Sequence, residues 1–255
     1  MVEYRLPPEL AERAREFALQ GGVPVQPRLA STVVLLREPF QAYLIRRVAT
    51  MAFAASMYAF PGGGVDPRDA AVHPGWAGPS PAEWAARLRL DEAVARSVVC
   101  AAVREVFEES GVLLAGPDAG TVVGDVSGVE WETARLALIA REFGFAEFLS
   151  RRGLVLRSDL LAPWSRWITP EFEHRRFDTY FFLAALPPGQ LTRDVGGEAD
   201  ETVWCPPADA IDGRFTMLPP TIHTLTELAD AGHVAAALAA ATTRDPAHPI
   251  TPTVS

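Results

Sequence analysis

Apolar positions along the chain recur with two different periods. Short runs rich in β-branched and aromatic residues, bounded by Gly, Pro or Asp, have the pattern of buried strands. Longer stretches repeat apolar residues every three to four positions, which is the pattern of amphipathic helices. The expected strands are Ser31–Leu36, Ala42–Arg47, Leu160–Trp167, Phe177–Leu186 and Glu201–Cys205. The expected helices are Pro8–Leu19, Ala82–Leu90, Asp91–Ser110, Trp131–Arg152 and Leu225–Ala241, the last with a possible break at Gly232.

The connections follow from Pro and Gly. Pro39 predicts a hairpin turn between the first two strands, and residues 60–64 predict a backbone turn almost without side chains. Residues 73–81 hold several Pro and Gly and predict a loop. Because strands and helices are interleaved throughout, we expect a single α/β domain over residues 1–245, with 246–255 as a flexible tail.

Composition narrows the class of protein. The chain has 255 residues, of which 49% are hydrophobic, and this is enough for a sizeable core. Its net charge of −9 argues against nucleic acid as a partner. All 23 basic residues are Arg, which excludes a lysine Schiff base and a phosphate-loop lysine. Cys100 and Cys205 lie far apart and form neither a disulfide framework nor a zinc motif. With no apolar run of membrane length and no signal-peptide pattern, a cytoplasmic protein without a membrane partner is expected.

Three carboxylates stand out on the helix expected at 91–110. Glu105, Glu108 and Glu109 are spaced i, i+3 and i+4 and share one arc of its surface. They repel one another and lie near the helix C-terminus, where negative charge is disfavoured. A bound cation relieves both effects, and oxygen ligands without Cys or His select Mg²⁺, Mn²⁺ or Ca²⁺. The alternative is a solvated acidic face on which Arg104 pairs with Glu108.

The surrounding residues resemble the signature box of Nudix hydrolases, G-x5-E-x7-R-E-U-x-E-E-x-G-U, where U is aliphatic. The second half of the box is matched by Arg104, Glu105, Val106, Glu108, Glu109, Gly111 and Val112. The first half resembles Phe60-Pro61-Gly62-Gly63, and five residues after Gly63 stands Asp69, where the family usually has Glu. The spacing is broken, because 34 residues separate Asp69 from Arg104 where the box has seven.

One branch of the superfamily, the "motif 19" type associated with coenzyme A hydrolysis, splits its box in the same way. The downstream blocks that resemble this branch are Trp167–Pro170, Arg175–Thr179, Phe181–Phe182, Trp204 and Pro219–Thr221. The resemblance implies a Nudix α/β/α sandwich with a mixed sheet. It also implies a helical insertion inside the box, at about 70–96, and extra C-terminal helices.

The resemblance also implies roles for single residues. Glu105, Glu108 and Glu109, with the backbone carbonyl of Gly62, are the expected ligands of Mg²⁺ or Mn²⁺. The same three glutamates and Arg104 are the expected catalytic residues, Arg104 by orienting a glutamate. Since Nudix dimers are frequent, a homodimer is one possible assembly.

Residues outside the box are expected to complete the site. We favour Glu198 over Glu201 as the general base, and a solvated acidic turn is the alternative for both. Arg47, Gly63 and Arg176 are the expected substrate contacts. Asp178, inside an apolar strand, is expected either to pair with an arginine such as Arg176 or to face the site.

The implied activity is hydrolysis of a diphosphate linkage in a small nucleoside diphosphate derivative. Coenzyme A or acyl-CoA is the first candidate, although only one of two arginines typical of coenzyme A hydrolases is kept, as Arg47, and the other falls on Ala52. ADP-ribose or NAD(H) is the close alternative. A non-catalytic Nudix module that senses a ligand would be expected to lose a box carboxylate, and all three are present.

Overall fold

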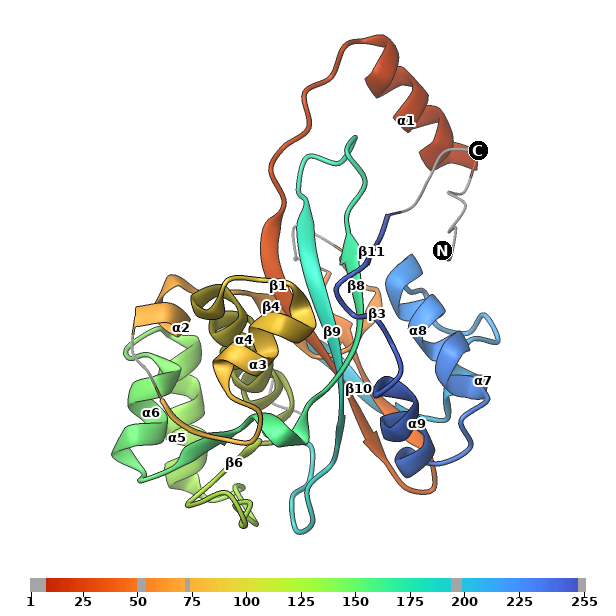
Figure 1. Cartoon of the computed structure of the whole chain (residues 1–255). Coiled ribbons are helices and arrows are strands. Elements are labelled where there is room, and N and C mark those ends of the chain that lie inside the picture. The colour runs from red at the N-terminus through yellow and green to blue at the C-terminus, as the bar shows by residue number, and fades with distance from the viewer. Residues whose placement is uncertain (1–7, 50–53, 72–73, 194–198, 252–255) are drawn as a thin grey trace.

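The computed structural model describes residues 8–49, 54–71, 74–193 and 199–251. At its centre is a mixed sheet with the strand order β10-β2-β1-β9-β8-β11 (Figure 1). The pair β1–β9 is parallel, whereas β1–β2, β2–β10 and β8–β9 are antiparallel. These strands are β1 (Arg28–Arg37), β2 (Gln41–Arg47), β8 (Ala162–Ile168), β9 (Phe177–Ala185), β10 (Ala199–Cys205) and β11 (Pro249–Ile250). Two short strands, β3 (Tyr58–Ala59) and β4 (Gly62–Gly64), pair with β2 and β1.

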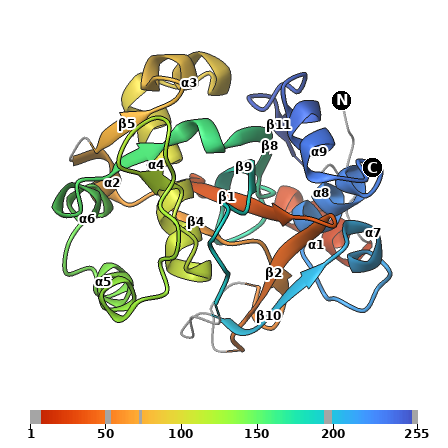
Figure 2. The same ribbon diagram turned by 90° about the horizontal axis from the view of Figure 1, so that it is seen from below.

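The central strands are buried on both faces. On β1, Val33 and Leu35 belong to one core, and Val34 and Leu36 belong to the other. Because side chains alternate across a strand, such continuous apolar runs need a layer of helices on each side. One side is covered by α4 (Glu92–Ser110) and α3 (Pro81–Leu88), and the other by α7 (Pro207–Ala210), α8 (Pro219–Ala229) and α9 (Val234–Ala241) (Figures 1 and 2). The expected α/β/α sandwich with a mixed sheet is confirmed.

A second, smaller lobe lies beside α4. Its three-stranded sheet has the order β5-β7-β6. Helix α6 contacts β5 and β7, and α5 lies against α4 and α6 (Figure 2). The elements are β5 (Gly75–Ala77), β6 (Ala115–Gly116), α5 (Val129–Ile139), α6 (Phe145–Arg151) and β7 (Val155–Arg157). Also present are α1 (Pro8–Leu19), which stands away from the sheet in Figure 1, α2 (Pro67–Ala71) and the 3₁₀ turn η1 (Ser158–Leu160).

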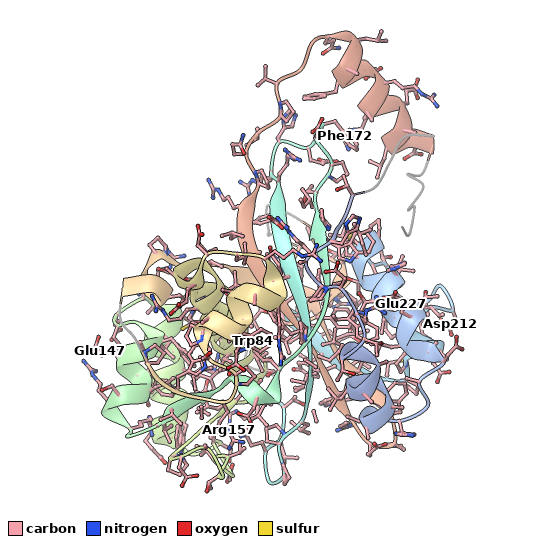
Figure 3. All side chains as sticks on the ribbon, viewed as in Figure 1. Trp84, Glu147, Arg157, Phe172, Asp212 and Glu227 are labelled. Atoms are coloured by element: carbon pink, nitrogen blue, oxygen red, sulfur yellow. The ribbon has the colours of Figure 1, made fainter. Side chains whose placement is uncertain are left out.

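The helix α3 of the box insertion packs beside α4, over the same face of the sheet. Ser80 caps α3, and it exchanges the two hydrogen bonds of a capping box with Glu83. Trp84 and Leu88 are fully buried, and the Trp84 ring meets Phe182 of β9 edge-on at 5.8 Å, under α3 (Figure 3). The expected helical insertion therefore forms part of a helical layer of the fold, and its apolar face is buried in the core.

Four local expectations differ from the structure. The helix expected over 131–152 is two helices, since Arg141 takes a left-handed φ of 62° between them. Residues 73–81 include β5, which pairs with β7, and residues 60–64 include β4, which pairs with β1. The segment after 245 was expected to be free, but Pro249 and Ile250 pair with β8 as an edge strand. The break in the C-terminal helix at Gly232, where φ is 74°, is confirmed.

Candidate active site

The carboxylates of α4 face the short glycine strand β4. The backbone N–H of Gly62 donates to Oε2 of Glu109 at 2.7 Å. A Cβ on Gly63 would lie 2.5 Å from Oε1 of Glu105, so the absence of a side chain is what lets that carboxylate approach the strand. The helix itself is tied to the sheet by Ser31 Oγ, which donates to the carbonyl of Val98 at 2.6 Å. Glu105 and Glu109 are therefore held against glycine backbone.

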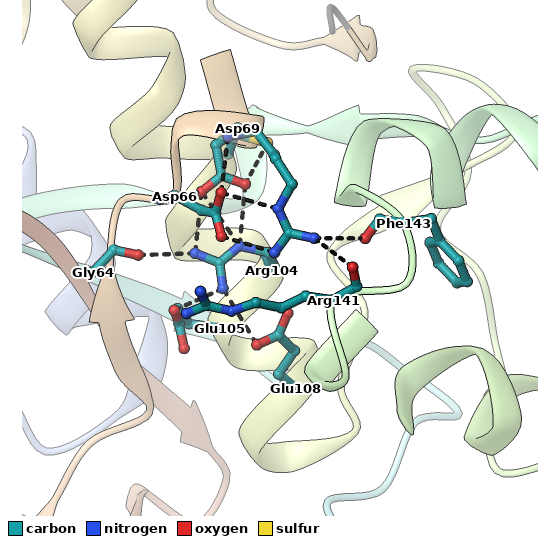
Figure 4. A network of polar contacts seen from close by, with 10 residues as sticks. Gly64, Asp66, Asp69, Arg104, Glu105, Glu108, Arg141 and Phe143 are labelled. Carbon is teal, nitrogen blue, oxygen red and sulfur yellow. Dashed lines mark hydrogen bonds and ion pairs between the residues drawn. The ribbon is translucent and has the colours of Figure 1, made fainter. Parts of the chain in front are cut away.

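Arg104 joins the two halves of the box. Its Nε is 3.1 Å and 3.3 Å from Oδ1 and Oδ2 of Asp69, and its Nη2 is 3.1 Å from Oδ2 (Figure 4). Nη2 also donates to the carbonyl of Gly64 at 2.9 Å. Nη1 donates to Glu105 at 2.7 Å and to Glu108 at 3.3 Å. The Arg104–Glu108 pair of the alternative interpretation is present, but it belongs to a buried network that also orients Glu105 and not to a solvated acidic face.

This network is almost completely buried. Asp69 is 1% exposed and Arg104 is 8% exposed. Burial lowers the pKa of Arg104, but the charges of Glu105 and Asp69 outweigh that effect and hold its pKa above the ordinary value. A carboxylate at position 69 keeps this guanidinium charged, and Asp serves in place of the usual Glu because α2 brings it within direct contact. The thiol of Cys100 lies 3.9 Å from Oδ1 of Asp69, and burial raises the pKa of that thiol, so it stays protonated.

Two arginines outside α4, one in α5 and one in the loop after β9, support the C-terminal end of α4. The last carbonyls of a helix lack partners inside the helix, and cations are favoured there. Arg135 of α5, whose side chain is fully buried, donates from Nη1 to the carbonyl of Glu108 at 2.7 Å. Arg193 donates its backbone N–H to the carbonyl of Ser110 at 3.0 Å. Glu132 pairs with both guanidinium groups. These contacts offset the unfavourable position of the three glutamates.

Asp66 and Arg68 form a clamp on the far side of the cluster. The carboxylate of Asp66 accepts from Nε and Nη2 of Arg68 at 3.0 Å and 2.8 Å. The hydrogen bonds from Arg68 lower the pKa of Asp66 to about 2. Nη1 of Arg68 reaches across to the carbonyls of Arg141 at 3.2 Å and Phe143 at 3.3 Å (Figure 4). The clamp therefore fixes the turn between α5 and α6 against the first half of the box.

The ligand types at α4 fit a hard divalent cation. The donors are carboxylate oxygens beside glycine backbone, the set that Mg²⁺ and Mn²⁺ prefer. The space left by the missing side chain of Gly63, called the Gly63 cradle below, holds the Glu105 carboxylate. Within the described residues, no three acidic, His or Cys side chains are gathered as an ion cage. Glu105 and Glu108 turn toward Arg104 instead, and Glu109 turns toward the Gly62 N–H.

The residues expected outside the box are placed differently. Arg47 ends β2 opposite Ala199 of β10, and its buried Nε has no partner among the described residues. Glu198 lies outside the described residues, so its role as general base stays a prediction. Glu201, the other candidate, pairs with Arg46 at 2.8 Å.

Arg176 and Asp178 belong to the framework of the sheet. Arg176 was expected to contact substrate, but its guanidinium donates to the carbonyls of Thr169 at 3.0 Å and Val25 at 2.8 Å and is buried there. Asp178 was expected to pair with an arginine or face the site, and it pairs with Arg166 through contacts of 2.7 Å and 2.6 Å. The partner differs from Arg176 because Arg166 lies on the neighbouring strand β8.

Sequence reasoning missed the supporting arginines Arg68 and Arg135. The sequence did contain a signal for the Asp66–Arg68 ion pair, since the two residues are two positions apart within the first half of the box. Arg135 had none, because its target is a backbone carbonyl 27 positions away.

Comparisons with known proteins show the family to which the chain belongs. The family model of the NUDT19 Nudix domain matches residues 82–226. A crystal structure of a NUDIX hydrolase from Alicyclobacillus acidocaldarius superposes with a TM-score of 0.68 at 28% identity, over 84% of this chain and 96% of that one. Nudix hydrolase 7 of Caenorhabditis elegans is 28% identical over 203 residues, 78% of this chain and 59% of that protein. The acyl-coenzyme A diphosphatase NUDT19 of Gallus gallus is 31% identical over 153 residues, 51% of this chain and 39% of that protein.

The split box, the sandwich and the glutamate helix are together those of a Nudix hydrolase. The chain belongs to the NUDT19 Nudix domain family, whose model covers more than half of it. It spans about 59% and 39% of the two curated relatives named above. Across the described part of the chain, every helix is too short or too polar to cross a membrane.

Proposed function

We propose that this protein hydrolyses a diphosphate linkage in a nucleoside diphosphate derivative, with Mg²⁺ or Mn²⁺ as cofactor. The observation that carries the proposal is the contact between Asp69 and Arg104. It brings both halves of the split box together beside Gly62 and Gly63, with Glu105 and Glu108 bonded to the same guanidinium.

The proposed roles follow from the contacts. Glu105, Glu108 and Glu109, with the backbone carbonyl of Gly62, would hold the cation. When bound, it would supply charge neutralisation for the diphosphate and Lewis-acid activation of the attacking water. Arg104 orients Glu105 and Glu108 and is itself held by Asp69. Glu198 is the proposed proton acceptor, and Arg47 and Gly63 are the proposed substrate contacts. Arg176 is not a proposed substrate contact, because its guanidinium is bonded to backbone carbonyls.

Coenzyme A or an acyl-CoA is the proposed substrate. Membership of the NUDT19 Nudix domain family supports it, as does the name of the chicken relative, an acyl-coenzyme A diphosphatase. An ADP-ribose or NAD(H) type substrate is the second candidate, because only Arg47 represents the arginine pair typical of coenzyme A hydrolases.

A substrate panel with mass identification of the products tests the proposal. Release of 3′,5′-ADP and phosphopantetheine selects coenzyme A, whereas release of AMP and ribose 5-phosphate selects ADP-ribose. Glu108→Gln and Glu109→Gln are the variants, and Glu92→Gln, exposed on the first turn of the same helix, is the matched control. We expect the first two to lose activity and the control to keep it. If no diphosphate is cleaved with either cation, the enzyme proposal fails. Ligand binding without cleavage would then support a sensing module.

A further inference from the structure

The guanidinium groups that border the carboxylate cluster are largely committed to protein partners. Arg104 uses Nε, Nη1 and Nη2 on Asp69, Glu105, Glu108 and the Gly64 carbonyl. Arg68 uses Nε, Nη1 and Nη2 on Asp66 and on two backbone carbonyls. A diphosphate carries several negative charges. Since the chain has no lysine, an ion pair between the protein and the diphosphate needs an arginine other than Arg104 and Arg68.

The turn between α5 and α6 is built into the border of the cluster. Phe143 and Gly144 line the same narrow pocket as Arg68, Arg104 and Glu108. This turn is not shaped by its own sequence alone, because Arg68 binds the carbonyls of both Arg141 and Phe143. The position of the turn is therefore tied to the first half of the box.

Arg141 occupies this turn in a conformation that an arginine seldom adopts. Its φ is 62°, in the left-handed region that favours glycine, so a non-glycine side chain here costs stability. The side chain is exposed, and its guanidinium makes no hydrogen bond or ion pair with the residues that the structure describes. Figure 4 shows it extending from the turn toward Arg104 and Glu105.

We propose that Arg141 binds the anionic diphosphate of the substrate over the carboxylate cluster. This proposal rests on the proposed function for the identity of the ligand and adds a binding residue from outside the box. An exposed, unpaired guanidinium presents its donors at no cost in broken ion pairs, and its planar fork suits phosphate oxygens. Arg68 acts through the backbone of the turn and is a positioning residue for Arg141.

Three substitutions separate the charge from the backbone conformation. Arg141→Gly keeps the left-handed turn and removes the guanidinium, so we expect an unchanged or higher melting temperature. Arg141→Gln removes the charge, and Arg141→Lys keeps the charge without the fork. Arg214→Gln is the matched control, because Arg214 is exposed and pairs with Asp212, which lies with α7 and α8 on the opposite side of the sheet (Figure 3).

The readout that does not depend on turnover is the affinity for ADP in the presence of Mg²⁺, measured by calorimetry. The affinity for adenosine, which lacks the diphosphate, is measured in the same way for comparison. We expect Arg141→Gly and Arg141→Gln to weaken ADP binding by about 10- to 100-fold, the loss typical of a charged hydrogen bond. Adenosine binding should not change, Arg141→Lys should recover part of the affinity, and Arg214→Gln should match wild type. For any diphosphate that is cleaved, KM should rise in the same order.

The proposal is overturned if Arg141→Gly and Arg141→Gln bind ADP like wild type, or if wild type binds no ADP. An equal loss of ADP and adenosine affinity also overturns it, since that would indicate a shape effect of the turn. If wild type cleaves no diphosphate but Arg141→Gln still weakens ADP binding, the proposed function fails and the phosphate contact at Arg141 stands.

Discussion

Asp69 and Arg104 are bonded side chain to side chain, with Oδ2 of the carboxylate 3.1 Å from Nη2 of the guanidinium. They lie 35 positions apart in the chain, and both are buried. An insertion between two halves of a catalytic motif can be tolerated only if the fold brings the halves back together. Here α2 and α4 pack side by side, and the insertion between them places α3 beside α4 on the same face of the sheet.

Replacing Asp69 should therefore be costly. Asp69→Ala leaves the buried Nε of Arg104 without its acceptor, whereas Nη1 keeps Glu105 and Glu108. We therefore expect a loss of about 1–3 kcal/mol in the free energy of unfolding. Urea denaturation measures it, with Asp230→Asn, exposed at the end of α8, as the control that should stay within about 0.5 kcal/mol of wild type. A loss below about 1 kcal/mol would show that Arg104 finds another partner.

The glycine strand offers a matched pair of substitutions. A Cβ at Gly63 would lie 2.5 Å from Oε1 of Glu105, whereas one at Gly64 would lie 3.9 Å from the nearest atom, the carbonyl oxygen of Leu29. We expect Gly63→Ala to displace the Glu105 carboxylate and to raise the Mg²⁺ concentration for half-maximal activity about 10-fold or more. Gly64→Ala should behave like wild type in the same metal titration. Equal effects of the two variants would exclude the cradle as the cause.

The clamp of Asp66 and Arg68 should make stability depend on acidic pH. The folded-state pKa of Asp66 is about 2, below the ordinary value of 3.8, so the charged carboxylate favours the folded state. Its contribution is present above about pH 4 and is lost as the pH falls through about 2. Because the Arg68 side chain is 37% exposed, solvent screening reduces it to about 1–2 kcal/mol. Urea denaturation of wild type and Asp66→Asn should show a gap of that size at pH 6 that shrinks below pH 4. A gap independent of pH would assign the effect to shape alone.

Arg135 is distant from the three glutamates in the sequence, but its replacement should lower both the free energy of unfolding and the activity. Its buried guanidinium caps the carbonyl of Glu108 and pairs with Glu132. Arg135→Leu leaves the Glu108 carbonyl without this donor and leaves Glu132 paired with Arg193. We expect a loss of about 2–4 kcal/mol in unfolding free energy, together with reduced activity. The control is Arg151→Gln, which breaks an exposed i,i+4 pair with Glu147 and should cost about 0.5 kcal/mol or less.

The sequence predicted most elements of the fold because hydrophobic periodicity reports burial directly. The helix over 92–110 and its end at Gly111, where φ is 71°, agree with expectation to within one residue at each end. The prediction of one helix over 131–152 was wrong, because the apolar periodicity of the sequence continues through the break between α5 and α6. The break is fixed by the bonds from Arg68 to the carbonyls of Arg141 and Phe143, by the left-handed Arg141 and by Gly144 at the start of α6.

The sequence alone determined the local arrangement of the candidate site: three glutamates on one helical arc, an arginine beside them and a glycine turn upstream, all of which depend on local spacing. Tertiary structure decided which charges meet. It paired Asp69 with Arg104 and Asp178 with Arg166, committed Arg176 to backbone carbonyls, and placed Arg135 under the helix end. The physical reason is that an ion pair is fixed by distance in space, and residues far apart in the chain carry no periodic signal of their contact.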